Sequence, residues 1–98
     1  MFSCYLLYSL KLNRFYIGST SLPVNERFKN HITKHYGRDA FTAKADDWEM
    51  FLSIDCVTFH QAKLIETHIK KMKSSNYIRN LKKFPEMIDD LLKKFSHS

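Results

Sequence analysis

The spacing of hydrophobic and polar positions changes along the chain, and each spacing predicts one kind of element. Residues 2–9 and 14–19 are rich in aromatic and branched side chains, which favour strands. The short polar break at 11–13 between these two segments predicts a hairpin. A further run with partial alternation, residues 48–56, predicts a third strand.

Helical spacing follows in two other parts of the chain. Apolar residues recur four positions apart after Pro23 and predict a helix over about residues 24–36, which Gly37 ends. Thr58 followed three residues later by Gln61 is typical of a capping box, so a second helix is expected to begin there and to reach about residue 73.

Two shorter helices complete the expected order ββαβααα, an α+β fold. One lies near residues 77–81, and Pro85 opens the other, whose acidic residues precede its basic ones as the helix dipole favours. A chain of 98 residues holds one hydrophobic core, so we expect one domain over residues 1–95 and a frayed tail over 96–98.

Composition adds an electrostatic expectation. Sixteen Lys and Arg against ten Asp and Glu give a net charge of +6 and a pI near 9.4, which favours polyanionic partners such as nucleic acid. Cys4 and Cys56 lie in apolar runs without metal-ligand spacing, so they are expected to be reduced core thiols in a cytoplasmic protein. No stretch has the length of a membrane span or the pattern of a signal peptide, and no membrane partner is expected.

Several reactive side chains occur in a recognisable order. Tyr5 precedes Tyr16-Ile17-Gly18, and Arg27, His31 and Glu66 follow. In this order and spacing the chain resembles the GIY-YIG nuclease family over about residues 2–81, and especially its small stand-alone bacterial members. The first motif is Ser3-Cys4-Tyr5 here, which keeps the tyrosine. The resemblance implies a central three-stranded antiparallel sheet flanked by helices, and a metal-dependent endonuclease.

The residue types fit phosphodiester hydrolysis. Arg27 and His31 are four residues apart on one helix face, where the guanidinium can oppose charge on a phosphate. Glu66 is expected near the start of its helix as the ligand of Mg²⁺ or Mn²⁺, since a single carboxylate is a typical partial ligand for an ion that keeps several waters.

The resemblance assigns activation of the attacking water to the motif tyrosines. We favour Tyr5 as the base and Tyr16 as the group that orients water or phosphate, with His31 able to receive the proton. Gly18 is expected to permit a close approach of backbone or substrate. For the family's late asparagine we favour Asn80 over Asn76.

Basic residues crowd the C-terminal half and are expected to follow a nucleic-acid backbone, although a solvated helix face is the alternative. The predicted contact residues are Lys63, Lys70, Lys71, Lys73, Tyr77 and Arg79, with Lys82 and Lys83 nearby.

Other functions remain open. A basic binding module without cleavage is one, and a subunit that depends on a protein partner for specificity is another. DNA is expected as the substrate, although no residue distinguishes it from RNA. A zinc pair of His31 and His35 lacks a third ligand, and the acids at 46–47 and 89–90 are expected in loop and helix-start roles.

Overall fold

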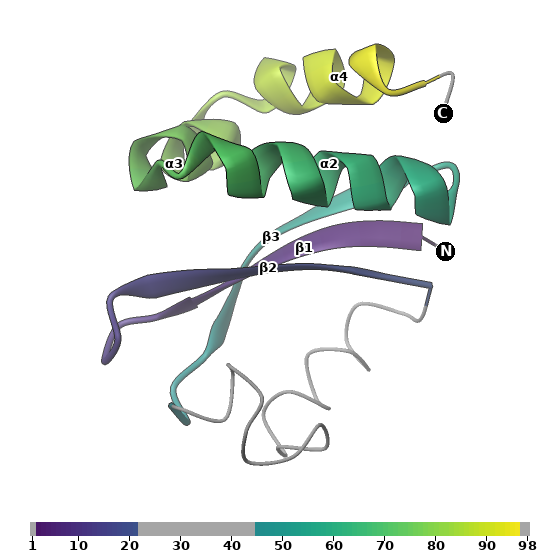
Figure 1. Cartoon of the computed structure of the whole chain (residues 1–98). Coiled ribbons are helices and arrows are strands. Elements are labelled where there is room, and N and C mark those ends of the chain that lie inside the picture. The colour runs from purple at the N-terminus through teal and green to yellow at the C-terminus, as the bar shows by residue number, and fades with distance from the viewer. Residues whose placement is uncertain (1, 22–44, 97–98) are drawn as a thin grey trace.

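The structure is a computed structural model that describes residues 2–21 and 45–96 (Figure 1). The helix expected over residues 24–36 lies outside the described residues. So do Arg27 and His31, whose proposed roles therefore stay predictions.

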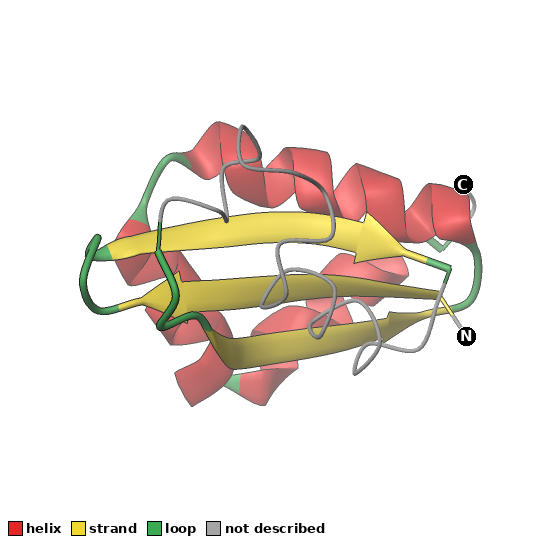
Figure 2. Ribbon diagram, turned by 90° about the horizontal axis from the view of Figure 1, so that it is seen from below, coloured by secondary structure: helices red, strands yellow, loops and turns green. Residues whose placement is uncertain are grey.

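Three antiparallel strands form the sheet, as expected. They are β1 (Phe2–Ser9), β2 (Arg14–Thr20) and β3 (Glu49–Cys56), in the order β2-β1-β3. Strand β1 is therefore central, and β2 is an edge strand of the sheet that the structure describes (Figure 2). The predicted bounds are confirmed to within one residue.

Three helices lie together on one side of this sheet (Figure 1). They are α2 (Phe59–Met72), α3 (Ser75–Lys83) and α4 (Pro85–Lys94), which confirms the predicted α+β class. None of the described helices is long and apolar enough to cross a membrane.

Alternating side chains of β1 divide the sheet into two faces. Cys4 and Leu6 are buried in a cluster with residues of the helices, among them Ile65 of α2. Tyr5 and Leu7 point the other way and are buried in a second cluster with Trp48. We call the side of the sheet that the helices cover the helix face, and the side of Tyr5 and Leu7 the tyrosine face.

The start of α2 has the predicted cap with one difference. Thr58 Oγ1 accepts a hydrogen bond from the Gln61 N–H at 3.0 Å. The Gln61 side chain, however, accepts from the Val57 N–H at 2.8 Å and donates to the Leu92 carbonyl at 3.1 Å. Because it is buried and must satisfy both of its polar ends, Gln61 joins α2 to α4 as well as capping α2.

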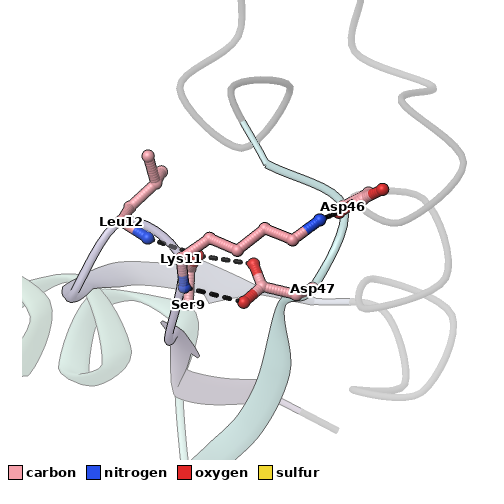
Figure 3. Close-up of polar contacts among 5 residues, drawn as sticks. All are labelled: Ser9, Lys11, Leu12, Asp46 and Asp47. Carbon is pink, nitrogen blue, oxygen red and sulfur yellow. Dashed lines mark hydrogen bonds and ion pairs between the residues drawn. The ribbon is translucent and has the colours of Figure 1, made fainter.

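The acids at 46–47 hold the hairpin turn, in keeping with the loop role expected for them (Figure 3). Asp47 accepts hydrogen bonds from the Ser9 hydroxyl at 2.6 Å and from the Lys11 N–H at 2.9 Å. The turn itself needs a left-handed residue, and Asn13 takes that conformation with φ 50°, which asparagine tolerates better than most residues. The hairpin therefore places β2 in a fixed register beside β1.

Candidate active site

Two neighbouring residues of β2 organise the candidate site. Gly18 pairs with Tyr5 of β1, and Ser19 pairs with Cys4. Since successive residues of a strand face opposite sides, Gly18 belongs to the tyrosine face and Ser19 to the helix face. The edge strand thus carries one contact of the site on each side of the sheet.

On the tyrosine face, the ring of Tyr5 lies over Gly18. A Cβ atom at position 18 would lie 2.5 Å from Tyr5 Oη and 2.6 Å from Tyr5 Cζ, closer than real Cβ atoms approach other heavy atoms. Tyr5 is fully buried, and the ring of Tyr16 lies 6.3 Å from it between centroids, inclined by 40°. Glycine is therefore required at position 18 so that the Tyr5 phenol can lie across the edge strand.

We expect Gly18→Ala to lower the free energy of unfolding by about 1–3 kcal/mol, since the new methyl group overpacks a buried ring. The measurement is urea unfolding of the parent and the variant. In a Tyr5→Leu background the same change should cost less, because the atoms that the methyl group would meet are gone. An equal cost in both backgrounds would contradict this packing.

On the helix face, Ser19 meets Glu66 of α2. The Ser19 hydroxyl donates to Glu66 Oε1 at 2.6 Å, and Lys70 Nζ lies 2.7 Å from Glu66 Oε2. Lys63 Nζ is 3.6 Å from Oε1. Glu66 is only 6% exposed and lies in the middle of α2, whereas the sequence led us to expect it near the start of the helix.

The Glu66 carboxyl is ionised at neutral pH. Burial alone would raise its pKa, but hydrogen bonds from Lys70 and Ser19, together with the charges of Lys70 and Lys63, outweigh burial and lower the pKa below its ordinary value. A charged, buried carboxylate on a helix whose other buried residues are mostly apolar is unusual, because unpaired burial of such a group is costly. Its partners explain why it is tolerated.

This lowered pKa predicts a pH dependence of stability. A carboxyl whose pKa is lower in the folded state stabilises the protein above its unfolded pKa of about 4.3, and this stabilisation is lost as the pH falls through the folded value. We therefore expect the parent to be more stable than Glu66→Gln at pH 7, with the difference shrinking towards pH 3. Urea midpoints across this range measure it, and a constant difference would contradict the ionised pair.

Glu66 has the chemistry to hold a hard cation. A carboxylate offers about four lone-pair positions. The hydrogen bonds from Ser19 and Lys70 use two of them, so lone pairs remain for a further ligand bond. In the described part of the chain no three His, Cys, Asp or Glu side chains cluster. A metal held here would accordingly rest on one described carboxylate, with water and phosphate as its other ligands, an arrangement that suits Mg²⁺.

Ser19 is the residue that sequence reasoning missed. It lies 47 positions from Glu66, so no local spacing connects the two. The available signal was the hairpin register, which sets Ser19 on the face opposite Tyr5 once the helices are known to cover that face. By its hydroxyl Ser19 positions the carboxylate, and we treat it as a positioning residue.

The predicted basic residues do not all lie together. Lys63 and Lys70 flank Glu66, and Lys73 follows at the left-handed end of α2 with φ 48°. Arg79 of α3 lies over the ring of Phe15, with its guanidinium carbon 5.4 Å from the ring centroid.

The remaining predicted residues lie elsewhere. Tyr77 contacts the ring of His68 at 6.0 Å between centroids, and Lys71 borders a shallow depression formed with α4. Asn80 and Asn76 are both exposed on α3, and the Asn80 carbonyl accepts a hydrogen bond from the Phe84 N–H. Among the predicted basic residues, Lys63 and Lys70 therefore contact Glu66, and no described contact joins Lys71, Lys73 or Arg79 to it.

Comparison with known proteins gives the family of the chain. A family model described as the GIY-YIG catalytic domain matches residues 1–80 of the 98. No curated protein and no solved structure matched the chain. The matched region contains the antiparallel sheet, the tyrosine face and Glu66. The chain belongs to the GIY-YIG family and carries its nuclease-type catalytic domain, that of a phosphodiester-cleaving endonuclease.

Proposed function

We propose that this chain is a Mg²⁺- or Mn²⁺-dependent endonuclease that hydrolyses phosphodiester bonds of nucleic acid, with DNA as its substrate, at a site centred on Gly18 and Ser19. One observation carries the proposal. The buried, charged Glu66 is hydrogen-bonded to Ser19 on the helix face, and the next residue of the edge strand, Gly18, lies under the Tyr5 phenol on the opposite face. GIY-YIG nucleases generally depend on a divalent metal, and Glu66 is suited to hold one.

Each residue then has a chemical role. Tyr5 takes the proton from the attacking water, with nearby positive charge favouring the phenolate form that can accept it. Tyr16 orients the water or the phosphate. A divalent cation held by Glu66 would polarise the phosphate and stabilise the departing 3′-oxygen.

Arg27 and His31 complete the proposed mechanism. The Arg27 guanidinium opposes the charge that builds on the non-bridging phosphate oxygens, and His31 receives the proton from the tyrosine. Both lie outside the described residues, so their roles rest on the family pattern alone.

The substrate class, the protein partner and the cellular compartment are also part of this proposal. The net charge of +6 supports a polyanionic substrate, and a protein partner could supply specificity that so small a chain lacks. Cys4 and Cys56 are free thiols, which supports a reducing, cytoplasmic compartment.

One observation favours a second function, a basic module that binds nucleic acid without cutting it. Both carboxylate oxygens of Glu66 already have cationic or hydroxyl partners, as in a purely structural ion pair. Cleavage decides between the two functions.

The test is incubation of the purified chain with labelled duplex, flap, branched and single-stranded DNA and with RNA, with Mg²⁺, Mn²⁺ or a chelator. The proposal predicts metal-dependent cleavage of at least one DNA substrate and none with chelator. Cleavage that is unaffected by chelator would contradict the metal role. Tight binding without cleavage of any substrate would favour the binding module.

Binding should depend steeply on salt, because phosphate neutralisation releases counterions. If about four phosphates are contacted, affinity should fall by about 100-fold between about 50 and 200 mM salt. Fluorescence anisotropy with chelator present, on duplexes of unrelated sequence, measures this dependence. An affinity that barely changes with salt, or that follows base sequence instead, would contradict electrostatic binding.

A further inference from the structure

A hollow opens beside Glu66, between the hairpin end of β2 and the junction of α2 with α3. Its volume is about 370 Å³. Three basic side chains, Arg14, Lys70 and Lys73, border it, and none of the described residues that line it is acidic. Ile17 and Ile69 belong to its apolar part. The hollow thus joins a concentrated positive charge to an apolar surface.

We infer that this hollow binds a backbone phosphate of the nucleic acid at a position separate from the phosphate that is cut. The inference rests on the proposed function. It adds the direction in which the nucleic-acid strand runs over the protein, from the cleaved phosphate to the hollow. It also assigns a phosphate contact to Arg14, a residue that no sequence motif had identified.

The charge of the hollow is available for a ligand. In residues 2–21 and 45–96, neither Arg14 nor Lys73 forms an ion pair with a carboxylate, whereas Lys70 is paired with Glu66. Both of the unpaired cations are exposed side chains, so a phosphate would gain their charge without a large desolvation cost. Arginine in addition presents a planar fork that matches phosphate oxygens in pairs.

The position of the hollow sets its distance from the cut. Lys70 borders the hollow and also contacts Glu66, so the two sites are continuous along α2. Lys73 lies seven residues beyond Glu66, or about 10 Å along a helix that rises about 1.5 Å per residue. The rise of about 3.4 Å per nucleotide is measured along the duplex axis, and successive phosphates of one strand lie about 7 Å apart, so the bound phosphate should lie about one or two nucleotides from the cut.

The hollow suits a nucleotide better than an isolated phosphate ion. Its apolar lining would leave a lone, fully hydrated anion poorly matched, while the sugar of a nucleotide can lie against Ile17 and Phe15. Free phosphate and a strand phosphate share the same recognition chemistry, so the experiment must separate them.

The experiment compares two double variants of the full chain. Arg14→Gln with Lys73→Asn, the hollow variant, removes the two cations that have no carboxylate partner among the described residues. Asparagine tolerates the left-handed conformation at position 73. Lys93→Gln with Lys94→Gln, the control variant, removes equal charge from the last turn of α4, away from the residues that border the hollow. Affinity for labelled DNA is measured by anisotropy with chelator, across a salt series.

We expect the hollow variant to bind at least about tenfold more weakly than the control variant at moderate salt, and its salt slope to be smaller than the parent's by about two. Equal affinity and slope in the two variants, while the parent binds and cleaves DNA, would overturn the inference and leave the proposed function standing. A parent that neither binds nor cleaves would overturn both.

A second measurement uses the unaltered protein and so does not depend on the variant's folding. Substrates with one uncharged methylphosphonate linkage at successive positions are bound and cut by the parent. A loss of affinity that is largest at a linkage about one or two nucleotides from the cut supports the inference. Equal losses at every linkage would overturn it. So would a competition experiment in which millimolar inorganic phosphate, at constant ionic strength, saturates the hollow and DNA binding is unchanged.

Discussion

Replacing Glu66 with glutamine should slow cleavage by at least about 100-fold, or about 2.7 kcal/mol in the activation barrier, while the protein stays folded. Glutamine keeps the size and helix preference of the residue, and its amide oxygen can still accept the Ser19 hydroxyl. It removes the negative charge that a hard cation needs. Affinity for DNA should persist or tighten, because Lys63 and Lys70 lose their acidic partner.

Single-turnover cleavage and anisotropy binding, measured side by side, test this separation of activity from affinity. Glu86→Gln is the control, since Glu86 is an exposed acid in the first turn of α4, away from the described contacts of Glu66. If Glu66→Gln cleaves as fast as the parent with the same dependence on Mg²⁺, Glu66 is not the ligand. If Glu66→Gln unfolds, the ion pairs of Glu66 are chiefly structural.

The second large effect concerns Tyr5, where removal of one hydroxyl group should abolish most cleavage. Tyr5→Phe retains the ring that lies over Gly18, so the fold should be kept, but the proposed base is gone. We expect a loss of about 100-fold or more in single-turnover rate, within the range that general-base catalysis contributes. DNA binding should change little.

Tyr8→Phe is the matched control for this experiment. Tyr8 lies on the same strand, and its hydroxyl donates to Asn13 Oδ1 at 2.7 Å in the hairpin turn, away from Gly18. Its loss should leave the cleavage rate close to that of the parent. If Tyr16→Phe abolishes cleavage and Tyr5→Phe does not, the roles of the two tyrosines are reversed. If neither change affects the rate, the water is activated by another group.

The elements of the fold could be predicted from local features. Partial alternation and aromatic content marked the strands, and Thr58 and Pro85 marked helix starts that the structure confirms. These signals succeed because a strand, a cap or a turn is specified within a few residues of sequence.

The site was less predictable, because its contacts join distant parts of the chain. The residue types could be selected from their order, yet the hydrogen bond between Ser19 and Glu66 has no local signature. The arrangement of Tyr5 and Glu66 on opposite faces of the sheet, with the edge strand between them, also depends on which face the helices cover. Tertiary packing decides this, and the hydrophobic pattern of a strand buried on both faces does not reveal it.

Which basic residues reach the site could not be predicted from local sequence either. Lys70 and Lys71 are neighbours in sequence, but consecutive helical residues point about 100° apart. Lys70 therefore meets Glu66, while Lys71 borders the depression beside α4. A run of lysines predicts the charge of a segment, and only the packing of the helix determines which of them reach the site.

Paramagnetic broadening by Mn²⁺ tests most directly whether the metal centre is at Glu66 on the edge of β2. Backbone amide signals of the chain are recorded by NMR during a Mn²⁺ titration, with reversal by chelator and with Glu66→Gln as the comparison. We predict that broadening begins at Gly18, Ser19 and the residues around Glu66, and that Glu66→Gln loses it. Broadening that begins at Asp46 and Asp47, or that is unchanged in Glu66→Gln, would contradict this account.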